Sequence, residues 1–308
     1  MQLSVIIPTH NPHPGRLQQT LRALRAQTLP TDQWETVLVD NASTPALALV
    51  DWNTDGPANL RLVTEPEPGL SHARRRGFLS GRGESFVLVD DDNELAPDYL
   101  AETLRLFAAH PKVGALGGRS LPEFEQAPEP WVREFDGLIA CRDLGQAPLI
   151  SHGLRNPTTG RNDYPMFAPM GAGMALRRAA AQSWLDEDGQ SALPDRKGSE
   201  LSSSGDNDIV LAAMAAGWEV AYFPTLRLTH LIPAFRTNCD YLARLNRGIQ
   251  RSWMQVLAKH DANPWPPLAA WSVPLRCAKA WFTHRAWSSA AAYVRWQGAC
   301  GHFEGRRH

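Results

Sequence analysis

Short apolar runs, each closed by polar residues, recur along the first ninety residues of the chain. They occupy residues 3–8, 34–39, 60–63 and 85–89. Runs of this length predict buried strands. After the first run, Pro14 opens a segment in which leucines recur at helical spacing, at Leu17, Leu21 and Leu24. Strands that alternate with helices predict an α/β fold with a mostly parallel central sheet covered by helices.

The pattern loosens beyond residue 90. A helix is expected from about Pro97 to His110, and an apolar strand follows at residues 113–118. From Leu121 to Tyr164 no period persists, and prolines, charges and glycines dominate. This composition predicts a long irregular excursion over the ligand-binding face.

Regular structure is expected again from the glycine-rich segment 170–176. The polar stretch Leu201–Asp208 then leads into an apolar helix. A last strand is expected at residues 218–223, with His230 shortly beyond it.

Three of the predicted strands end in polar residues, namely Thr9, Asp40 and the run Asp90–Asp92. Ligands of such sheets bind beyond the carboxyl ends of the strands, so we expect these residues to meet in one crevice. Neighbouring carboxylates repel one another unless a cation compensates them, which makes the acidic run a candidate metal site. A solvated acidic turn is the alternative interpretation of the run taken alone.

Charge is distributed unevenly along the 308 residues, although the net charge is −1. Residues 241–308 hold ten Lys or Arg against two Asp or Glu, and six of the eleven tryptophans. We therefore divide the chain into a catalytic domain, 1–240, and a basic, Trp- and Ala-rich helical C-terminal extension, 241–308. This extension fits a peripheral membrane contact, and equally a helical appendage packed on the core.

Cysteine usage and the N-terminus bear on the cellular location. The four cysteines show no C-x-x-C spacing, so neither a zinc site nor a disulfide framework is predicted. The first residues read as a strand rather than a leader, and no apolar stretch reaches membrane-spanning length. A cytoplasmic protein is expected, with peripheral association at the inner face of the membrane as an option.

Five segments, in this order, resemble the motifs of the inverting family 2 glycosyltransferases. They are Ser4–Asn11, Glu35–Ser43, Gly69–Gly77, the run Asp90–Asp92 with its DxD spacing, and Gly205–Asp206. The resemblance spans about residues 3–236 and implies the GT-A nucleotide-diphospho-sugar transferase fold. In the third segment, an arginine at position 75 stands where the family usually has asparagine.

The resemblance also implies roles for individual residues. Asp206 takes the place of the catalytic base, although Asp208 is close enough in sequence to exchange roles with it. Asp92 and His230 take the places of contacts to Mg²⁺ or Mn²⁺. The donor would contact Pro8, Thr9, Asn11, Asp40, Arg74, Asp90 and Asp91.

The implied reaction moves a sugar from a nucleoside diphosphate, with UDP favoured over dTDP or GDP, to a hydroxyl of a glycan or lipid-linked acceptor. Two alternatives stay open: a metal-dependent nucleotidyltransferase, and a non-catalytic nucleotide-sugar-binding protein on the same fold. The sequence lacks the P-loop and the dinucleotide-binding glycine motifs. Nucleic acid is not an expected partner, because the basic residues lie outside any reading motif.

Overall fold

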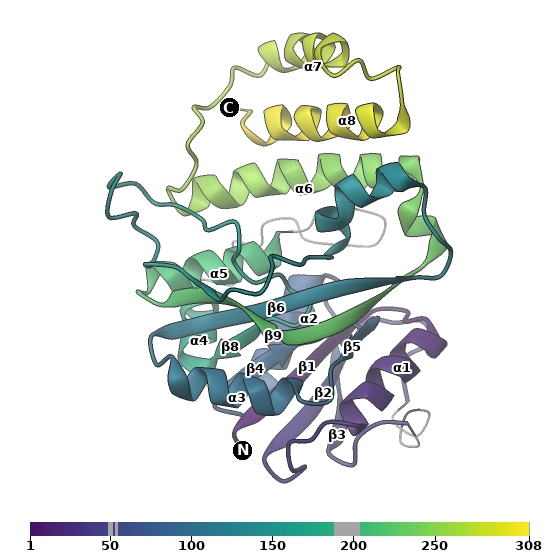
Figure 1. Ribbon diagram of the computed structural model, residues 1–308, viewed down its shortest axis with the longest axis vertical. Coiled ribbons are helices and arrows are strands. Elements are labelled where there is room, and N and C mark those ends of the chain that lie inside the picture. Colours follow the sequence, from purple (N-terminus) through teal and green to yellow (C-terminus); the bar gives the residue numbers. More distant parts are fainter. Residues whose placement is uncertain (49–51, 53–54, 188–203, 308) are drawn as a thin grey trace.

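The computed structural model describes residues 1–48, 52, 55–187 and 204–307, and this part of the chain is built on a nine-stranded sheet (Figure 1). The spatial order is β3-β2-β1-β4-β8-β6-β9-β5, and β7 pairs with β9. The strands are β1 (Leu3–Thr9), β2 (Trp34–Asn41), β3 (Leu60–Glu65), β4 (Ser85–Leu88), β5 (Asn93–Leu95), β6 (Val113–Phe124), β7 (Leu149–Ile150), β8 (Ala175–Arg177) and β9 (Glu219–Ile232).

The longest pairings of the sheet are parallel. Strands β1 to β4 pair in parallel, as do the two long strands β6 and β9. The short strand β8 joins these two groups by antiparallel pairing with β4 and β6, and β5 and β7 pair antiparallel with β9. The predicted α/β sheet is confirmed, with one antiparallel strand, β8, inside the sheet and two more, β5 and β7, paired with β9.

Helices cover both faces of the sheet (Figure 1). Helices α1 (Pro14–Arg25) and α3 (Tyr99–Ala109) contribute to one apolar core, and α2 (Leu70–Ser80), α4 (Arg178–Asp186) and α5 (Gly205–Ala215) to the other. Alternation along β1 serves both cores, because Val5 and Ile7 face the first and Ile6 the second.

Beyond the sheet, three helices are stacked on one another (Figure 1). They are α6 (Cys239–Lys259), α7 (Ser272–Thr283) and α8 (Ala290–Gly305), and we call them the helical layer. The chain also forms two 3₁₀ segments: η2 (Pro130–Ile139) follows β6, and η3 (Ala234–Thr237) lies between β9 and α6. A shared apolar cluster links η2 to the layer through Val132, Leu242 and Val294.

Helices α6 and α8 approach closely because glycines line their contact. A Cβ atom at Gly301 would lie 2.1 Å from the carbonyl oxygen of Arg247, and one at Gly305 would lie 2.3 Å from that of Arg251. At the same contact, Arg247 forms an ion pair with Glu304.

Two expectations from the sequence need correction. Residues 121–164 are not wholly irregular, because β6 continues to Phe124 and the segment also contains η2 and β7. The last strand does not end at residue 223 but continues to Ile232, so His230 lies inside β9 rather than beyond it. A longer run of alternating burial explains the extension, since one face of β9 stays covered to its end.

Two further expectations stay predictions. The Leu201–Ser203 part of the predicted polar stretch lies outside the described residues. A domain boundary at residue 240 stays a prediction, and α6 begins at Cys239. Within the described ranges, no helix has both the length and the apolar character needed to cross a bilayer.

Candidate active site

A cavity of about 440 Å³ opens at the carboxyl ends of β1 and β4. Helices α2 and α5 supply two of its walls, and η2, η3 and α6 contribute further residues. It brings together eight of the residues singled out in the sequence: Pro8, Thr9, Arg74, Asp90, Asp91, Asp92, Asp206 and His230. The expected convergence of strand ends is thus observed for β1 and β4.

The acidic run follows β4 and is held in a tight turn. Asn93 is fully buried, and its side-chain oxygen accepts a hydrogen bond from the backbone N–H of Asp90 at 3.2 Å. The hydroxyl of Thr9 donates to the carboxylate of Asp91. Burial, together with the negative charges of Asp92 and Asp90, raises the pKa of Asp91 to about 7. Burial and repulsion between these neighbouring carboxylates thus disfavour the ionised form of Asp91.

Asp92 contacts two buried basic side chains. Its Oδ2 accepts a hydrogen bond from Nη1 of Arg236 at 3.0 Å, and its Oδ1 lies 3.2 Å from Nε2 of His230. The pairing of β5 with β9 places His230 opposite Asn93, which explains the proximity. Arg236 was not identified from the sequence, because a single arginine after a strand belongs to no recognised motif. Its position six residues after His230 was the feature that could have indicated it.

These residues fit a bound divalent cation. Carboxylate oxygens are the donors that Mg²⁺ and Mn²⁺ prefer, and a bound cation would offset the repulsion that raises the pKa of Asp91. His230 adds a buried Nδ1 atom that has no hydrogen-bond partner among the residues that the structure describes.

Arg74 reaches the cavity from α2. Its side chain is buried, and within the described part of the chain its Nε atom has no hydrogen-bond partner. The backbone of Gly171 passes so close that a Cβ atom there would lie 2.3 Å from Nη2 of Arg74. The neighbouring Arg75 and Arg76 are exposed, so only the first arginine of this run belongs to the site.

Asn41 fixes the approach to α2 and was not identified from the sequence. Its side-chain nitrogen donates to the carbonyl oxygens of Glu65 and Glu67, at 3.1 and 2.7 Å. Its oxygen accepts the N–H of Gly69 at 2.8 Å, and Gly69 directly precedes the helix. The chain enters α2 through Gly69 at φ 144°, a conformation that favours glycine.

Two predicted donor contacts, Asn11 and Asp40, do not line the cavity. Both carboxylate oxygens of Asp40 accept backbone N–H groups, from Ser43 at 3.1 Å and from Leu47 at 3.0 Å. Asn11 accepts the N–H of Thr44 at 2.8 Å. Both side chains thus organise the turn after β2, beside the cavity.

Asp206 lies in the first turn of α5 and faces the cavity. Its Oδ2 accepts the N–H of Gly171 at 2.9 Å, and its Oδ1 accepts the N–H of Asn207 at 3.0 Å. These bonds fix the carboxylate beside the glycine that faces Arg74.

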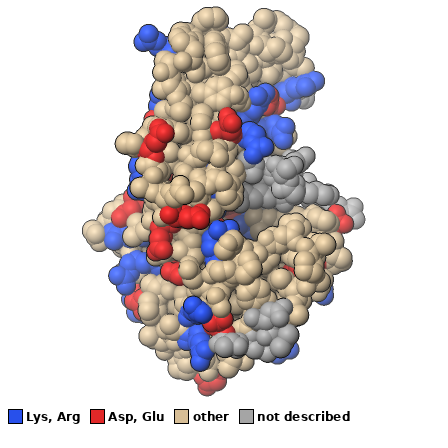
Figure 2. Space-filling model, turned by 90° about the vertical axis from the view of Figure 1, so that its right-hand side faces the viewer, with Lys and Arg blue, Asp and Glu red and all other residues tan. Residues whose placement is uncertain are grey.

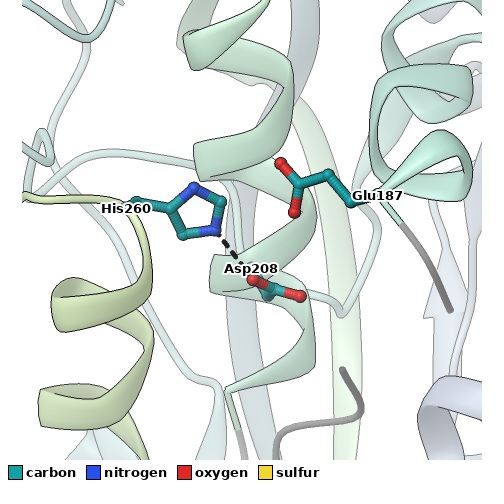
Figure 3. A group of neighbouring side chains, drawn as sticks. All are labelled: Glu187, Asp208 and His260. Atoms are coloured by element: carbon teal, nitrogen blue, oxygen red, sulfur yellow. Dashed lines mark hydrogen bonds and ion pairs between the residues drawn. The ribbon is translucent and has the colours of Figure 1, made fainter. Parts of the chain in front are cut away.

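Asp208 points elsewhere, into a cluster with Glu187 and His260 (Figure 3). Its Oδ1 lies 2.8 Å from Nε2 of His260 and 2.8 Å from Nζ of Lys259. Burial raises the pKa of Asp208, but hydrogen bonds from His260, Lys259 and Trp184 outweigh it, so the pKa lies below its usual value. Asp208 therefore anchors α5 to α6.

Glu187, Asp208 and His260 have potential ligand atoms within 4.8 Å of one another, which is close enough to hold a metal ion. The ammonium of Lys259 lies 2.8 Å from Glu187 and 2.8 Å from Asp208. A lysine thus supplies the positive charge in this cluster.

Comparison with known proteins gives a family match. The model of the family described as "Glycosyl transferase family 2" matches residues 4–184, more than half of the chain. A curated relative, the glucosyl-dolichyl phosphate glucuronosyltransferase of Haloferax volcanii, is 24% identical over 202 residues. That alignment covers 63% of this chain and 59% of the relative's length.

Two solved structures share the fold at low sequence identity. Residues 1–349 of S. aureus TarS in complex with UDP are 15% identical, with a TM-score of 0.52. That match covers 99% of this chain and 90% of the other. The mannosyltransferase PcManGT from Pyrobaculum calidifontis, in complex with GDP-Man and Mn²⁺, is 22% identical, with a TM-score of 0.57 over 95% and 73% of the two chains.

Proposed function

Because the chain belongs to glycosyl transferase family 2 and has the GT-A fold, we propose that it moves a sugar from a nucleoside-diphosphate donor to an acceptor hydroxyl with inversion. One observation carries this proposal. A single cavity gathers the acidic run, the buried cation of Arg74 and the carboxylate of Asp206. Diphosphate binding and base catalysis require these groups within reach of one substrate.

The proposed donor is a UDP-sugar, with dTDP- and GDP-sugars as the other candidates. The nucleotides held by the two solved relatives, UDP and GDP-Man, support a nucleoside-diphosphate donor. Arg74 would hold the diphosphate, because its buried guanidinium lines the cavity and its Nε has no partner among the described residues. Pro8 and Thr9 would form the floor on which the donor lies.

The acidic run would bind the donor's metal ion. A bound Mg²⁺ or Mn²⁺ would act as a Lewis acid that stabilises the charge developing on the departing diphosphate. Asp92 and His230 would contact the ion, and Arg236 would orient the carboxylate of Asp92 through its hydrogen bond. The Mn²⁺ in the mannosyltransferase complex supports this assignment.

Asp206 is the proposed base. As the acceptor oxygen bonds to the anomeric carbon, its proton would pass to the Asp206 carboxylate. The bond from the anomeric carbon to the diphosphate oxygen breaks, and the diphosphate leaves with the electron pair. A single displacement of this kind inverts the anomeric centre. Asp208 is a poor candidate for the role, since it lies outside the cavity and is bound to Lys259 and His260.

The proposed acceptor is a glycan or a lipid-linked sugar. The name of the Haloferax relative describes transfer to a glucosyl-dolichyl phosphate, which is a lipid-linked acceptor. This supports the lipid-linked form.

The test measures donor binding and nucleotide release for UDP-, dTDP- and GDP-sugars, with Mn²⁺ or with EDTA. In wild type we expect one donor to bind in a metal-dependent way. Asp92→Ala should weaken that binding. Asp206→Asn should retain binding but lower turnover by roughly 10²–10⁴-fold, the usual contribution of a general base.

Asp208→Asn serves as the matched control, because it removes a carboxylate two residues away and should leave turnover per folded molecule unchanged. Binding of no donor, with or without metal, would contradict the proposal. Donor binding without turnover in wild type would favour a non-catalytic binding protein.

A further inference from the structure

An apolar stripe runs along the outer side of α7. Trp271, Leu275 and Phe282 are 75%, 65% and 69% exposed, and Pro274 and Ala278 between them are exposed as well. Spacings of three and four residues place these side chains on one face of the helix. Of the large hydrophobic side chains that the described residues expose, few others lie so close together in the sequence.

The stripe lies opposite the face by which α7 packs on α8. On the packed face, Val273 and Ala280 are buried, and the ring of Trp281 lies 4.7 Å from that of Trp296. Trp296 also donates a hydrogen bond to the carbonyl oxygen of Cys277 at 2.9 Å. The helix therefore has two apolar faces, of which the fold buries one.

Cations flank the exposed face. Arg276 and Lys279 are exposed on α7, and Arg285 follows the helix. The sequence contains no acidic residue between Asp261 and Glu304. In Figure 2 the upper end of the molecule, which holds α7 and α8 in Figure 1, is mostly uncharged surface with basic groups at its margins.

A tryptophan extends the apolar surface beyond the helix. Trp287 is 57% exposed, and its ring packs edge-on against Phe282 with the centroids 5.9 Å apart. Aromatic rings next to cations suit the interface between lipid headgroups and acyl chains.

We infer that α7 is a docking surface for an anionic lipid bilayer and lies flat on it. The stripe Trp271–Leu275–Phe282 would enter the headgroup region, and Arg276 and Lys279 would contact lipid phosphates. The positive charges on α7 disfavour a second copy of the chain as the partner that covers this surface. A symmetric contact would bring both sets of cations together, and α7 offers no carboxylate to pair with them. The inference does not depend on the transfer reaction.

The first test is co-sedimentation of the full chain with vesicles. Phosphatidylcholine vesicles with and without phosphatidylglycerol separate the apolar contribution from the charge contribution. We expect the partition coefficient on anionic vesicles to fall at least tenfold in the double variant Leu275→Asp/Phe282→Asp. Leu79→Asp is the matched control, because Leu79 is 56% exposed on α2 and should leave binding unchanged.

The second test removes charge and leaves the apolar stripe intact. Arg276→Gln/Lys279→Gln should weaken binding to anionic vesicles by about fivefold for each cation. Binding to neutral vesicles should be weak and unaffected by this change. Circular dichroism and thermal melting show whether each variant is folded. If the aspartate variant fails to fold, two results still test the inference: weaker vesicle binding of the glutamine variant, and weaker wild-type binding when salt is added.

Three outcomes would overturn the inference. One is wild-type binding that is equally strong on neutral and anionic vesicles. Another is anionic binding that the Leu275→Asp/Phe282→Asp variant retains. The third is a wild-type dimer in sedimentation velocity that this variant dissociates, without vesicle binding, which would assign the stripe to a second copy.

Discussion

In the sheet, apolar side chains on both faces pack into two cores, and polar residues stand at the strand ends beside the cavity. In the helical layer, glycines allow α6 and α8 to approach closely, and apolar rings remain exposed. The first arrangement forms a cavity lined by polar residues, and the second presents an exposed apolar surface. The two regions meet at the cavity, where Ile249 of α6 lines the same space as Asp206 of α5. The difference teaches that the polar cavity and the exposed apolar residues occupy different parts of one chain.

The strongest test of this contrast concerns a residue that serves the cavity. Arg74→Met should weaken donor binding by roughly 1000-fold, because the diphosphate would lose a buried charged partner. Arg75→Met is the control, since Arg75 is exposed one residue further along α2. Isothermal titration calorimetry measures both. Equal effects of the two substitutions would contradict the assignment of Arg74 to the diphosphate.

The next test addresses the contact between α5, which packs on the sheet, and α6 of the helical layer. Asp208→Asn should lower the free energy of unfolding by about 3 kcal/mol, because it breaks the buried ion pair with Lys259 that joins α5 to α6. Urea denaturation measures the change. Asp206→Asn, which lies in the same helix but faces the cavity, should unfold within about 1 kcal/mol of wild type. A larger loss in Asp206→Asn than in Asp208→Asn would reverse the roles of these two residues.

A smaller effect is expected within the helical layer. Gly301→Ala should destabilise the protein by about 2 kcal/mol, since the added methyl group would meet the backbone oxygen of Arg247 and force α8 away from α6. Gly15→Ala in α1 is the control, because the nearest atom there lies at an ordinary 3.4 Å. A stabilised Gly301→Ala would show that α8 shifts without cost.

The smallest effect concerns pH. The folded pKa of Asp208 lies below its unfolded value of about 3.8, so the ionised carboxylate stabilises the fold above pH 3.8. That contribution is lost as the pH falls through the lower folded pKa. Wild type should therefore lose more stability than Asp208→Asn in this window, by at most about 1.4 kcal/mol per pH unit. Identical acid unfolding curves would contradict the prediction.

Strands β1 to β4 could be predicted from the sequence because each is an apolar run that ends in polar residues. Apolar runs closed by Thr9 and by the acidic run were sufficient to predict the cavity edge, since parallel strands bring their carboxyl ends together. The place of Asp40 was not predictable in the same way. Its oxygens bond to N–H groups of the following turn, and that choice depends on local backbone geometry.

Arg236, which long-range pairing brings to the site, could not be identified from the sequence. Arg236 reaches Asp92 only because β9 runs beside β5, and the extension of β9 beyond residue 223 was not predicted. The exposed stripe of α7 was foreseen only as an excess of tryptophan and cations. Which of those tryptophans would pack on α8 depended on the partner helix, and the sequence pattern of α7 alone does not specify it.

Strand β9 joins the two regions mechanically as well as along the chain. The backbone that leaves His230 runs through Ile232 and Arg236 and enters α6 at Cys239, nine residues further along the chain, and His230 and Arg236 both contact Asp92. One short segment thus carries both side chains that contact Asp92 and leads directly into the helical layer. A displacement of α6 would therefore have to be absorbed within nine residues of the chain or shift the partners of Asp92.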